Sequence, residues 1–412
     1  MKKFIALLVF ALMLLAGPIF GQHQEDTLKI RLFDNVSLLF QPSLFPDGDI
    51  TKKEDLLYLG NGRIALKKIS IPSSSMNRKA EIVVRLVSNG DPWDKTGSCF
   101  LLPQKSGINM LDIAANRAVY PPHDTTRYEN LSGIVQGENY LPTVELMRFM
   151  TPFGVGHFSD NADSVSAKRR PVYVDGWSSY VEWRQDITDL LPLLEENPYV
   201  GVFVDTWTKD GYLVDVTINL MESILPCDSK PVSHVEPLIN TVYYIGQKHP
   251  DIFSRKDVVI PFSIPENAKN VRMKYITTGH GGHSGGDEFR PQKNTLRVDN
   301  DTVLELMPWR TDCAAFRRFN PTSGVWLKKR TIAYISDEGK RVEKEIEEPI
   351  ASSDLSRSNW CPGSDIPPVV VPLPNISAGK HILTISIPDS QPIKENELNH
   401  WLVSAYLVWD VE

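Results

Sequence analysis

"VDVTINLM", residues 214–221, alternates apolar and polar side chains along its length. Successive side chains of a β-strand point to opposite faces, so the alternate valine, isoleucine and leucine residues would share one face. The stretch therefore predicts a strand with one face in a core and the other toward polar surroundings.

Three further stretches also predict strands, through such alternation or through enrichment in β-branched residues: "NVRMKYITT" (270–278), "HILTISIPD" (381–389) and "LVSAYLVWD" (402–410). The best helical window, "QDITDLLPLLEEN" (185–197), contains Pro192, which limits a helix to about one turn. Glycine and proline punctuate the chain, and we find no internal repeat of the kind a propeller has. The pattern favours an all-β protein built of sandwiches or jelly rolls.

The chain has 412 residues, which allows two domains with separate cores. A proline-rich, polar segment near 225–235 is the best boundary, so we expect domains at 22–228 and 229–412. A charge-rich stretch, 336–354, is a second candidate break, but a solvated hairpin and loop explains it better. The net charge of −7 argues against a nucleic-acid partner.

The N-terminus predicts an exported protein. Residues 1–21 contain "MKK", then the apolar run "FIALLVFALMLLAG", then small residues, which is the anatomy of a signal peptide. The run is short for a spanning helix, and no second run of that length follows. We therefore expect a mature protein, periplasmic or secreted, without a membrane span. The four cysteines, Cys99, Cys227, Cys313 and Cys361, allow three disulfide connectivities in such a protein.

The most unusual stretch is "TTGHGGHSGGDEF" (277–289). His280 and His283 offer a pair of metal ligands, but a glycine-rich loop imposes no geometry on them and no third ligand is close in sequence. A phosphate cradle would need a lysine and a helix, whereas the chain continues as a strand. A loop that presents Asp287 or Glu288 to a ligand remains, beside the simpler interpretation of a solvated acidic turn.

Two other acids stand beside tryptophan. Asp94 follows Trp93, and Asp205 ends an apolar strand two residues before Trp207. Aromatic planes bind sugar faces, and an acid at the end of a buried strand can be partly desolvated, which raises its pKa. A role as ordinary turn residues is the alternative for both. No serine nucleophile elbow is present, so a hydrolase would depend on carboxylates and water.

Five segments in order resemble the peptide:N-glycosidase F family, bacterial secreted amidases that remove N-glycans from asparagine. They are "PWDK" (92–95), "RFMTPFGVG" (148–156), "VDTW" (204–207), the glycine-rich loop with Glu288-Phe289, and "RSNWCPG" (357–363), the most specific of them. The resemblance implies two adjacent antiparallel eight-stranded jelly-roll sandwiches with the site at their interface.

Carried over residue by residue, the resemblance gives Asp94 as the principal catalytic carboxylate, Glu288 as the second essential acid and Asp205 as the third. It gives Arg357 a supporting role in contact with substrate. The aromatic residues expected in the substrate site are Trp93, Trp207 and Trp360. The disulfide implied by the family joins Cys313 to Cys361, which leaves Cys99 and Cys227 as a further possible pair.

The sequence also departs from the family pattern. Asp205 replaces a glutamate, and insertions lie around 103–140 and 324–352. The implied reaction is hydrolysis of the amide between the innermost GlcNAc and asparagine, without metal or organic cofactor, on N-glycoproteins or N-glycopeptides, by a monomer. The alternatives are a non-catalytic N-glycan-binding protein, for which Asp205 is the best support, a glycoside hydrolase with two carboxylates, and a metal-dependent oxygenase, against which the lack of histidine-rich motifs counts.

Overall fold

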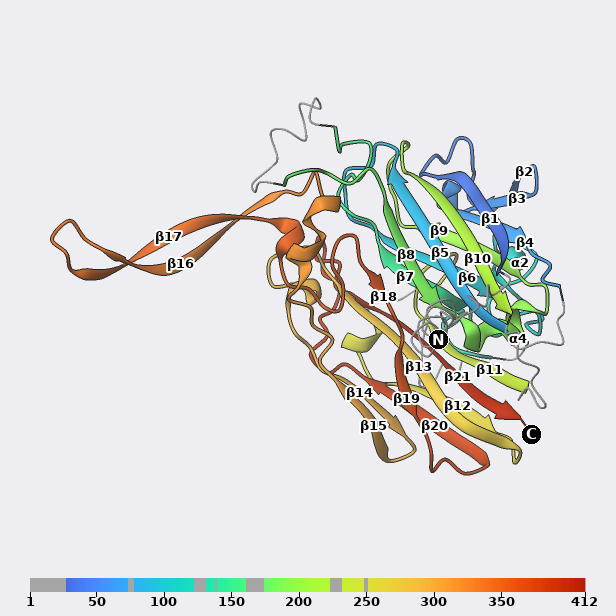
Figure 1. Ribbon diagram of the computed structural model, residues 1–412. Coiled ribbons are helices and arrows are strands. Elements are labelled where there is room, and N and C mark those ends of the chain that lie inside the picture. Colours follow the sequence, from blue (N-terminus) through green and yellow to red (C-terminus); the bar gives the residue numbers. More distant parts are fainter. Residues whose placement is uncertain are drawn as a thin grey trace, which may run out of the picture.

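Two β-sandwiches lie side by side in the computed structural model (Figure 1). The structure describes residues 27–72, 78–121, 131–137, 139–160, 174–222, 232–247 and 251–411. The expected signal peptide at 1–21 and the expected boundary at 228–229 lie outside the described residues. Within them, no helix is long and apolar enough to cross a membrane.

The N-terminal sandwich packs a four-stranded sheet on a seven-stranded sheet, both antiparallel. The four-stranded sheet has the order β1 (Thr27–Leu38), β10 (Tyr212–Glu222), β5 (Arg78–Ser88), β8 (Val181–Asp186). The larger sheet has the order β18 (Asp365–Ile366), β7 (Val144–Met150), β6 (Thr96–Leu102), β9 (Tyr199–Val204), β4 (Ile64–Lys68), β3 (Leu56–Leu59), β2 (Thr51–Lys53). Strand β18 comes from the C-terminal half of the chain, so the two halves share this sheet.

The C-terminal sandwich packs two four-stranded sheets face to face, and its eight strands fit the expected jelly roll. One sheet has the order β11 (Val232–Asn240), β21 (His400–Val411), β13 (Ala268–His280), β19 (Val369–Pro372). The other has the order β12 (Val258–Ile264), β20 (Gly379–Ser386), β14 (Asn294–Val298), β15 (Asp301–Leu306). The two sheets enclose an apolar core that includes Tyr275, Leu383 and Trp401.

The stretch 214–221 forms the middle of β10, and its alternate side chains are buried, as predicted. The predicted strands at 270–278 and 402–410 lie within β13 and β21, and the stretch 381–389 forms most of β20 but extends three residues beyond its end at Ser386. The helical window divides between the end of β8 and two single turns, and Pro192 lies in the first turn of the second. The short helices are η1 (Gly60–Gly62), α2 (Met110–Ala114), η2 (Thr188–Leu190), α4 (Leu191–Leu194), η3 (Ile252–Ser254), η4 (Asp287–Phe289), η5 (Cys313–Phe319) and η6 (Ser352–Asp354).

The charge-rich stretch 336–354 supplies the turn and second strand of a long hairpin, as predicted. Its strands are β16 (Val325–Ile335) and β17 (Arg341–Ala351), which pair in register along their whole length. The hairpin projects from the body of the molecule (Figure 1).

A buried ion pair connects the two sandwiches. Arg148 and Glu145 of β7 are both fully buried, with 3.0 Å from Arg148 Nε to Glu145 Oε2. The same guanidinium donates to the Leu402 carbonyl of β21 at 2.6 Å and to Thr278 of β13. One arginine therefore neutralises an acid of the N-terminal sandwich and satisfies backbone of the C-terminal one. This contact is one of those that hold the two domains together.

Replacing Arg148 with methionine should destabilise the protein by about 3–5 kcal/mol, because Glu145 would remain buried without a partner. Urea unfolding at neutral pH measures the loss. The double variant Arg148→Met/Glu145→Gln is the matched control and should recover part of the stability, since it leaves no buried charge unpaired. Equal stability of the single variant and the native protein would contradict the assigned role.

Candidate active site

The loop between β5 and β6, residues 89–95, carries Asp94 to the junction of the sandwiches. Asp91 is fully buried and anchors this loop: it accepts hydrogen bonds from Trp93 N at 3.0 Å and from Thr206 Oγ1 at 2.7 Å. Thr322, from the C-terminal half, donates to the Pro92 carbonyl. Both domains therefore hold the loop, and Asp94 has a fixed position.

Glu288 lies in η4, the single helical turn that ends the glycine-rich loop. The loop continues β13, and its backbone folds closely, since a Cβ on Gly281 would lie 2.4 Å from Asn399 Oδ1. Asp287 is fully buried and accepts hydrogen bonds from Gln292, Ser390, Gln391 and Trp401. The interpretation of a solvated acidic turn is therefore wrong, because Asp287 anchors the loop and Glu288 is buried beside it.

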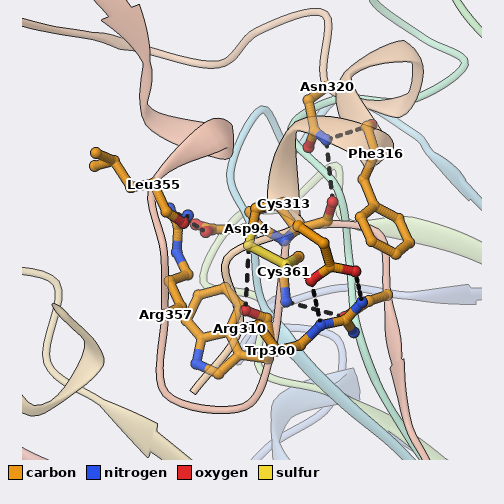
Figure 2. Close-up of a disulfide and its surroundings, with 12 residues drawn as sticks. Asp94, Arg310, Cys313, Phe316, Asn320, Leu355, Arg357, Trp360 and Cys361 are labelled. Carbon is orange, nitrogen blue, oxygen red and sulfur yellow. Dashed lines mark hydrogen bonds and ion pairs between the residues drawn. A yellow bond between two sulfur atoms is a disulfide. The ribbon is translucent and has the colours of Figure 1, made fainter. Parts of the chain in front are cut away.

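Arg357 brings the acids of the two domains together. Its side chain is buried, its Nε donates to Glu288 Oε1 at 2.8 Å, and its Nη2 lies 3.9 Å from Asp94 Oδ2. The guanidinium carbon lies 5.1 Å from the ring centre of Phe289 and 4.9 Å from that of Trp360. Figure 2 shows Arg357 facing Asp94 beside a disulfide. The arrangement is one cation shared by two carboxyl groups.

Burial raises the pKa of both acids. Desolvation is the main cause for each, and the charge of Arg357 opposes it. The pKa of Glu288 rises from 4.5 to about 7, and the neighbouring Asp94 contributes to that rise. A single guanidinium therefore does not fully compensate two desolvated carboxylates, and the pair retains a proton more readily than an exposed pair would.

Asp205 follows β9 directly, as predicted, and lies in a second cluster. Arg63 Nη1 is 3.1 Å from Asp205 Oδ1, and the Tyr243 hydroxyl donates to Oδ2 at 3.0 Å. Burial raises the pKa of Asp205, and the charge of Arg63 opposes this most strongly. The Arg63 guanidinium lies 4.4 Å from the ring centre of Trp207, so the cluster ends in an aromatic plane.

The tryptophans divide into two groups. Trp93 and Trp207 are 50% and 57% exposed, whereas Trp360 is 2% exposed. Exposed rings can offer a face to a ligand, which agrees with the expectation for the first two. Trp360 packs against Arg357 and donates from its indole N–H to the Gly279 carbonyl at 2.9 Å. A role in holding Arg357 fits this burial better than the expected direct contact with substrate.

The histidines of the glycine-rich loop make ordinary hydrogen bonds. His280 is buried, lies 2.8 Å from Thr278 Oγ1 and stacks between the rings of Trp360 and His400. His283 lies 3.1 Å from Asn399 Oδ1. Within the described part of the chain, no three histidine, cysteine, aspartate or glutamate side chains are arranged to hold a metal ion.

Cys313 and Cys361 form the disulfide that the resemblance implied, with 5.1 Å between their Cα atoms. It joins η5 to the segment after Arg357 and so braces the loop that carries the arginine (Figure 2). Cys99 is a free thiol buried in β6, which corrects its suggested pairing with Cys227. Cys227 itself lies outside the described residues.

Three residues of the site were not expected from the sequence: Phe40, Arg63 and Tyr243. Phe40 packs against Trp207 with 4.9 Å between ring centres, and the other two bind Asp205. They follow β1, η1 and β11, far from Asp205 in sequence, and none belongs to a quoted motif. Only the fold brings them together.

Two β-sandwiches with an acid-lined site at their junction define a two-domain jelly-roll protein. Two family models match it: "Peptide-N-glycosidase F, N terminal" over residues 29–220 and "Peptide-N-glycosidase F, C terminal" over residues 248–408. The chain therefore belongs to the peptide-N-glycosidase F family, which confirms the resemblance.

Solved structures agree with the family assignment. PNGF-II is similar at 31% identity and a TM-score of 0.78, over 94% of this chain and 66% of that one. The chain thus spans less than the full length of PNGF-II. PNGase F, described as a glycosylasparaginase from Flavobacterium meningosepticum, is similar in fold at 15% identity and a TM-score of 0.57, over 94% of this chain and 96% of that one. No curated protein sequence matches significantly.

The raised pKa of Glu288 makes stability depend on pH. A carboxyl group with a raised pKa in the folded state stabilises that state fully below pH about 4.5, and this contribution disappears as the pH rises through about 7. The loss amounts to about 3 kcal/mol, and the raised pKa of Asp94 acts in the same direction.

Urea unfolding between pH 4.5 and pH 8 tests this prediction. The native protein should lose stability over that range, and Glu288→Gln should reduce the dependence on pH. Glu266→Gln changes an exposed glutamate and should leave the dependence as in the native protein. Parallel profiles for the native protein and Glu288→Gln would contradict the raised pKa.

Proposed function

We propose that this protein hydrolyses the amide bond between the innermost GlcNAc of an N-glycan and asparagine, which releases the glycan and converts asparagine to aspartate. The observation that carries the proposal is the contact of Arg357 with acids of both domains, Glu288 at 2.8 Å and Asp94 at 3.9 Å. Membership of the peptide-N-glycosidase F family supports it.

The reaction needs a base for water, a cation for the oxyanion and a proton for the departing nitrogen. We assign Asp94 as the base at the reacting amide. Glu288, whose raised pKa favours the protonated form, orders the water and donates its proton to the departing nitrogen, and the proton that Asp94 took from water then restores it. Arg357 Nη2 and Asp94 Oδ2 are too far apart for a direct hydrogen bond, and we assign this edge of the guanidinium to stabilise the oxyanion. The products are a glycosylamine and an aspartate-containing peptide.

The glycan would lie along the N-terminal sandwich. Trp93 and Trp207 are its exposed aromatic residues near the two acid clusters. Asp205 and Arg63 are bound to one another and support the ring of Trp207, so they would orient the sugar plane. The residues of this cluster would act on binding, whereas Asp94, Glu288 and Arg357 would act on the reaction.

We further propose that the protein acts outside the cytoplasm, as a monomer, on N-glycoproteins or N-glycopeptides and without a cofactor. The signal-like sequence at 1–21 supports export. The proposed chemistry uses water, the two carboxyl groups and the guanidinium of Arg357.

A non-catalytic N-glycan-binding protein is the second candidate, because Asp205 replaces the family glutamate. The pairing of Asp205 with Arg63 weakens this candidate, since the shorter acid still closes a complete cluster. A glycosidase would break a sugar–sugar or sugar–nitrogen bond at carbon and leave the asparagine side chain as an amide. The products therefore separate the three functions.

Cleavage in heavy-oxygen water is the direct test. The mature protein should convert glycosylated asparagine to aspartate that carries one heavy oxygen, with the glycan released intact. Mass spectrometry of the peptide reads the mass change, with core α1,3-fucosylated and unfucosylated N-glycopeptides compared. Unlabelled asparagine or a peptide with one remaining GlcNAc would contradict the amidase.

Asp94→Asn and Glu288→Gln should each lower kcat by roughly 10³-fold, because each removes one proton-transfer group. Asp210→Asn changes an exposed aspartate on the N-terminal domain and should retain native activity. Steady-state kinetics on one glycopeptide measures all three variants. Native kcat in Asp94→Asn would exclude it as the base.

Asp205→Ala should act mainly on binding, because Asp205 holds Arg63 against Trp207. KM should rise about tenfold, which corresponds to the loss of one charged hydrogen bond, and kcat should change little. Asp205→Asn, which keeps a hydrogen bond to Arg63 or Tyr243, should lose less. A fall in kcat with unchanged KM would instead place Asp205 in the reaction.

A further inference from the structure

We call the hairpin of β16 and β17, residues 325–351, the arm. Each strand has 11 residues and would extend about 37 Å at the usual rise of 3.4 Å per residue. The two strands form a sheet of their own, and no other described strand pairs with either outer edge. The arm therefore leaves a row of backbone donors and acceptors unpaired along each side.

One face of the arm carries four apolar side chains toward its tip, interspersed with the charged residues Arg330 and Lys344. Cross-strand partners share a face, so the register places Ile332, Tyr334, Val342 and Ile346 on the same side. Tyr334 is 44% exposed, and the other three are partly exposed. A free two-stranded hairpin is marginally stable, and a contiguous exposed apolar surface usually marks an interaction site. The apolar side chains on this face are therefore available for contact with a partner.

The base of the arm is continuous with the catalytic loops. Ser352 N, immediately after β17, donates to the Gly324 carbonyl immediately before β16 at 2.8 Å, which closes the base. Thr322 bonds to the loop that carries Asp94, and Arg357 follows β17 by six positions. A ligand held on the arm is therefore connected to the loop of Asp94 and to Arg357 through short segments of the chain.

The proposed function implies that the glycan and the polypeptide of the substrate lie on different sides of the site. The exposed aromatic rings and the Asp205 cluster belong to the N-terminal sandwich, so the glycan would lie there. The polypeptide on the other side of the scissile amide would then lie toward the C-terminal domain, from which the arm projects (Figure 1). Residues 325–351 contain six basic and six acidic residues, so the arm has no net charge that would favour a nucleic acid or an anionic membrane.

We propose that the arm binds the polypeptide of the glycoprotein substrate, in extended form, along its apolar face and a free strand edge. An extended chain would satisfy the unpaired backbone groups by adding a strand, and its apolar side chains would cover the exposed face. The proposal rests on the proposed function and adds its substrate class: glycosylated polypeptides that extend well beyond the modified asparagine. The arm contributes to binding and takes no part in the reaction.

A shortened arm tests the proposal. Removal of Thr331–Tyr334 together with Val342–Glu345 deletes four cross-strand pairs and keeps the turn and the base. Two substrates with the same glycan are compared: a blocked tripeptide glycosylated on its central asparagine, and an unfolded glycopeptide of about 30 residues. The shortened protein should lose about tenfold or more in kcat/KM on the long substrate, through KM, and retain native kinetics on the short one.

A point variant removes the apolar face without shortening the arm. Ile332→Thr, Tyr334→Thr and Val342→Thr together keep strand-forming residues and should reproduce the selective loss on the long substrate. Lys329→Thr with Glu345→Thr is the matched control, because it changes an ion pair on the opposite face. The control should behave as the native protein on both substrates.

The outcomes separate the arm from the proposed function. Equal kinetics of native and shortened proteins on the long substrate would overturn the role of the arm and leave the amidase intact. Light scattering of the same proteins tests whether the arm instead binds a second copy of this chain. If the native protein is a dimer, the shortened protein is a monomer and the substrate preference is unchanged, the proposal is also overturned. Failure of the native protein to cleave even the short substrate would overturn the proposed function itself.

Discussion

The site depends on one buried guanidinium that two domains share. Arg357 lies out of water, and a buried cation requires negative partners, which Glu288 of the C-terminal domain and Asp94 of the N-terminal domain supply. Two desolvated carboxyl groups then compete for one positive charge, and the pKa of each is raised. The shared guanidinium therefore contributes both to the contact between the domains and to the setting in which the pKa of each carboxyl group is raised.

The surrounding structure makes this arrangement rigid. Asp91 and Thr322 fix the loop of Asp94, Asp287 fixes the loop of Glu288, and the Cys313–Cys361 disulfide fixes the loop of Arg357. Arg148 joins the sandwiches a short distance away along β7 and β13. Apart from the disulfide, each anchor is a buried, hydrogen-bonded polar group, which is costly to rearrange. Reacting groups held in this way need little reorganisation when a substrate binds.

The sequence predicted those features that depend on local pattern. Alternating side chains located β10 and β20, and runs rich in β-branched and apolar residues located β13 and β21, of which β21 is buried on both faces over residues 401–409. Order along the chain, compared with a known family, brought Asp94, Asp205, Glu288 and Arg357 into consideration. The partners of Asp205 were not predicted, because Arg63 and Tyr243 meet it only through strand pairing and domain contact. The burial of Trp360 was not predicted for the same reason, because the sequence does not show which distant residues pack against a ring.

Asp205 illustrates how a shorter acid can preserve a site. A carboxylate at the end of β9 reaches less far than a glutamate would, and here both of its oxygens are occupied, one by Arg63 and the other by Tyr243. Because Arg63 also lies against Trp207 and Phe40, the charge of Asp205 fixes an aromatic plane. An acid whose two oxygens are bound in this way is poorly suited to move a proton. This geometry is the reason for the proposed division of roles, in which Asp205 supports the aromatic plane and the acids around Arg357 take part in the reaction.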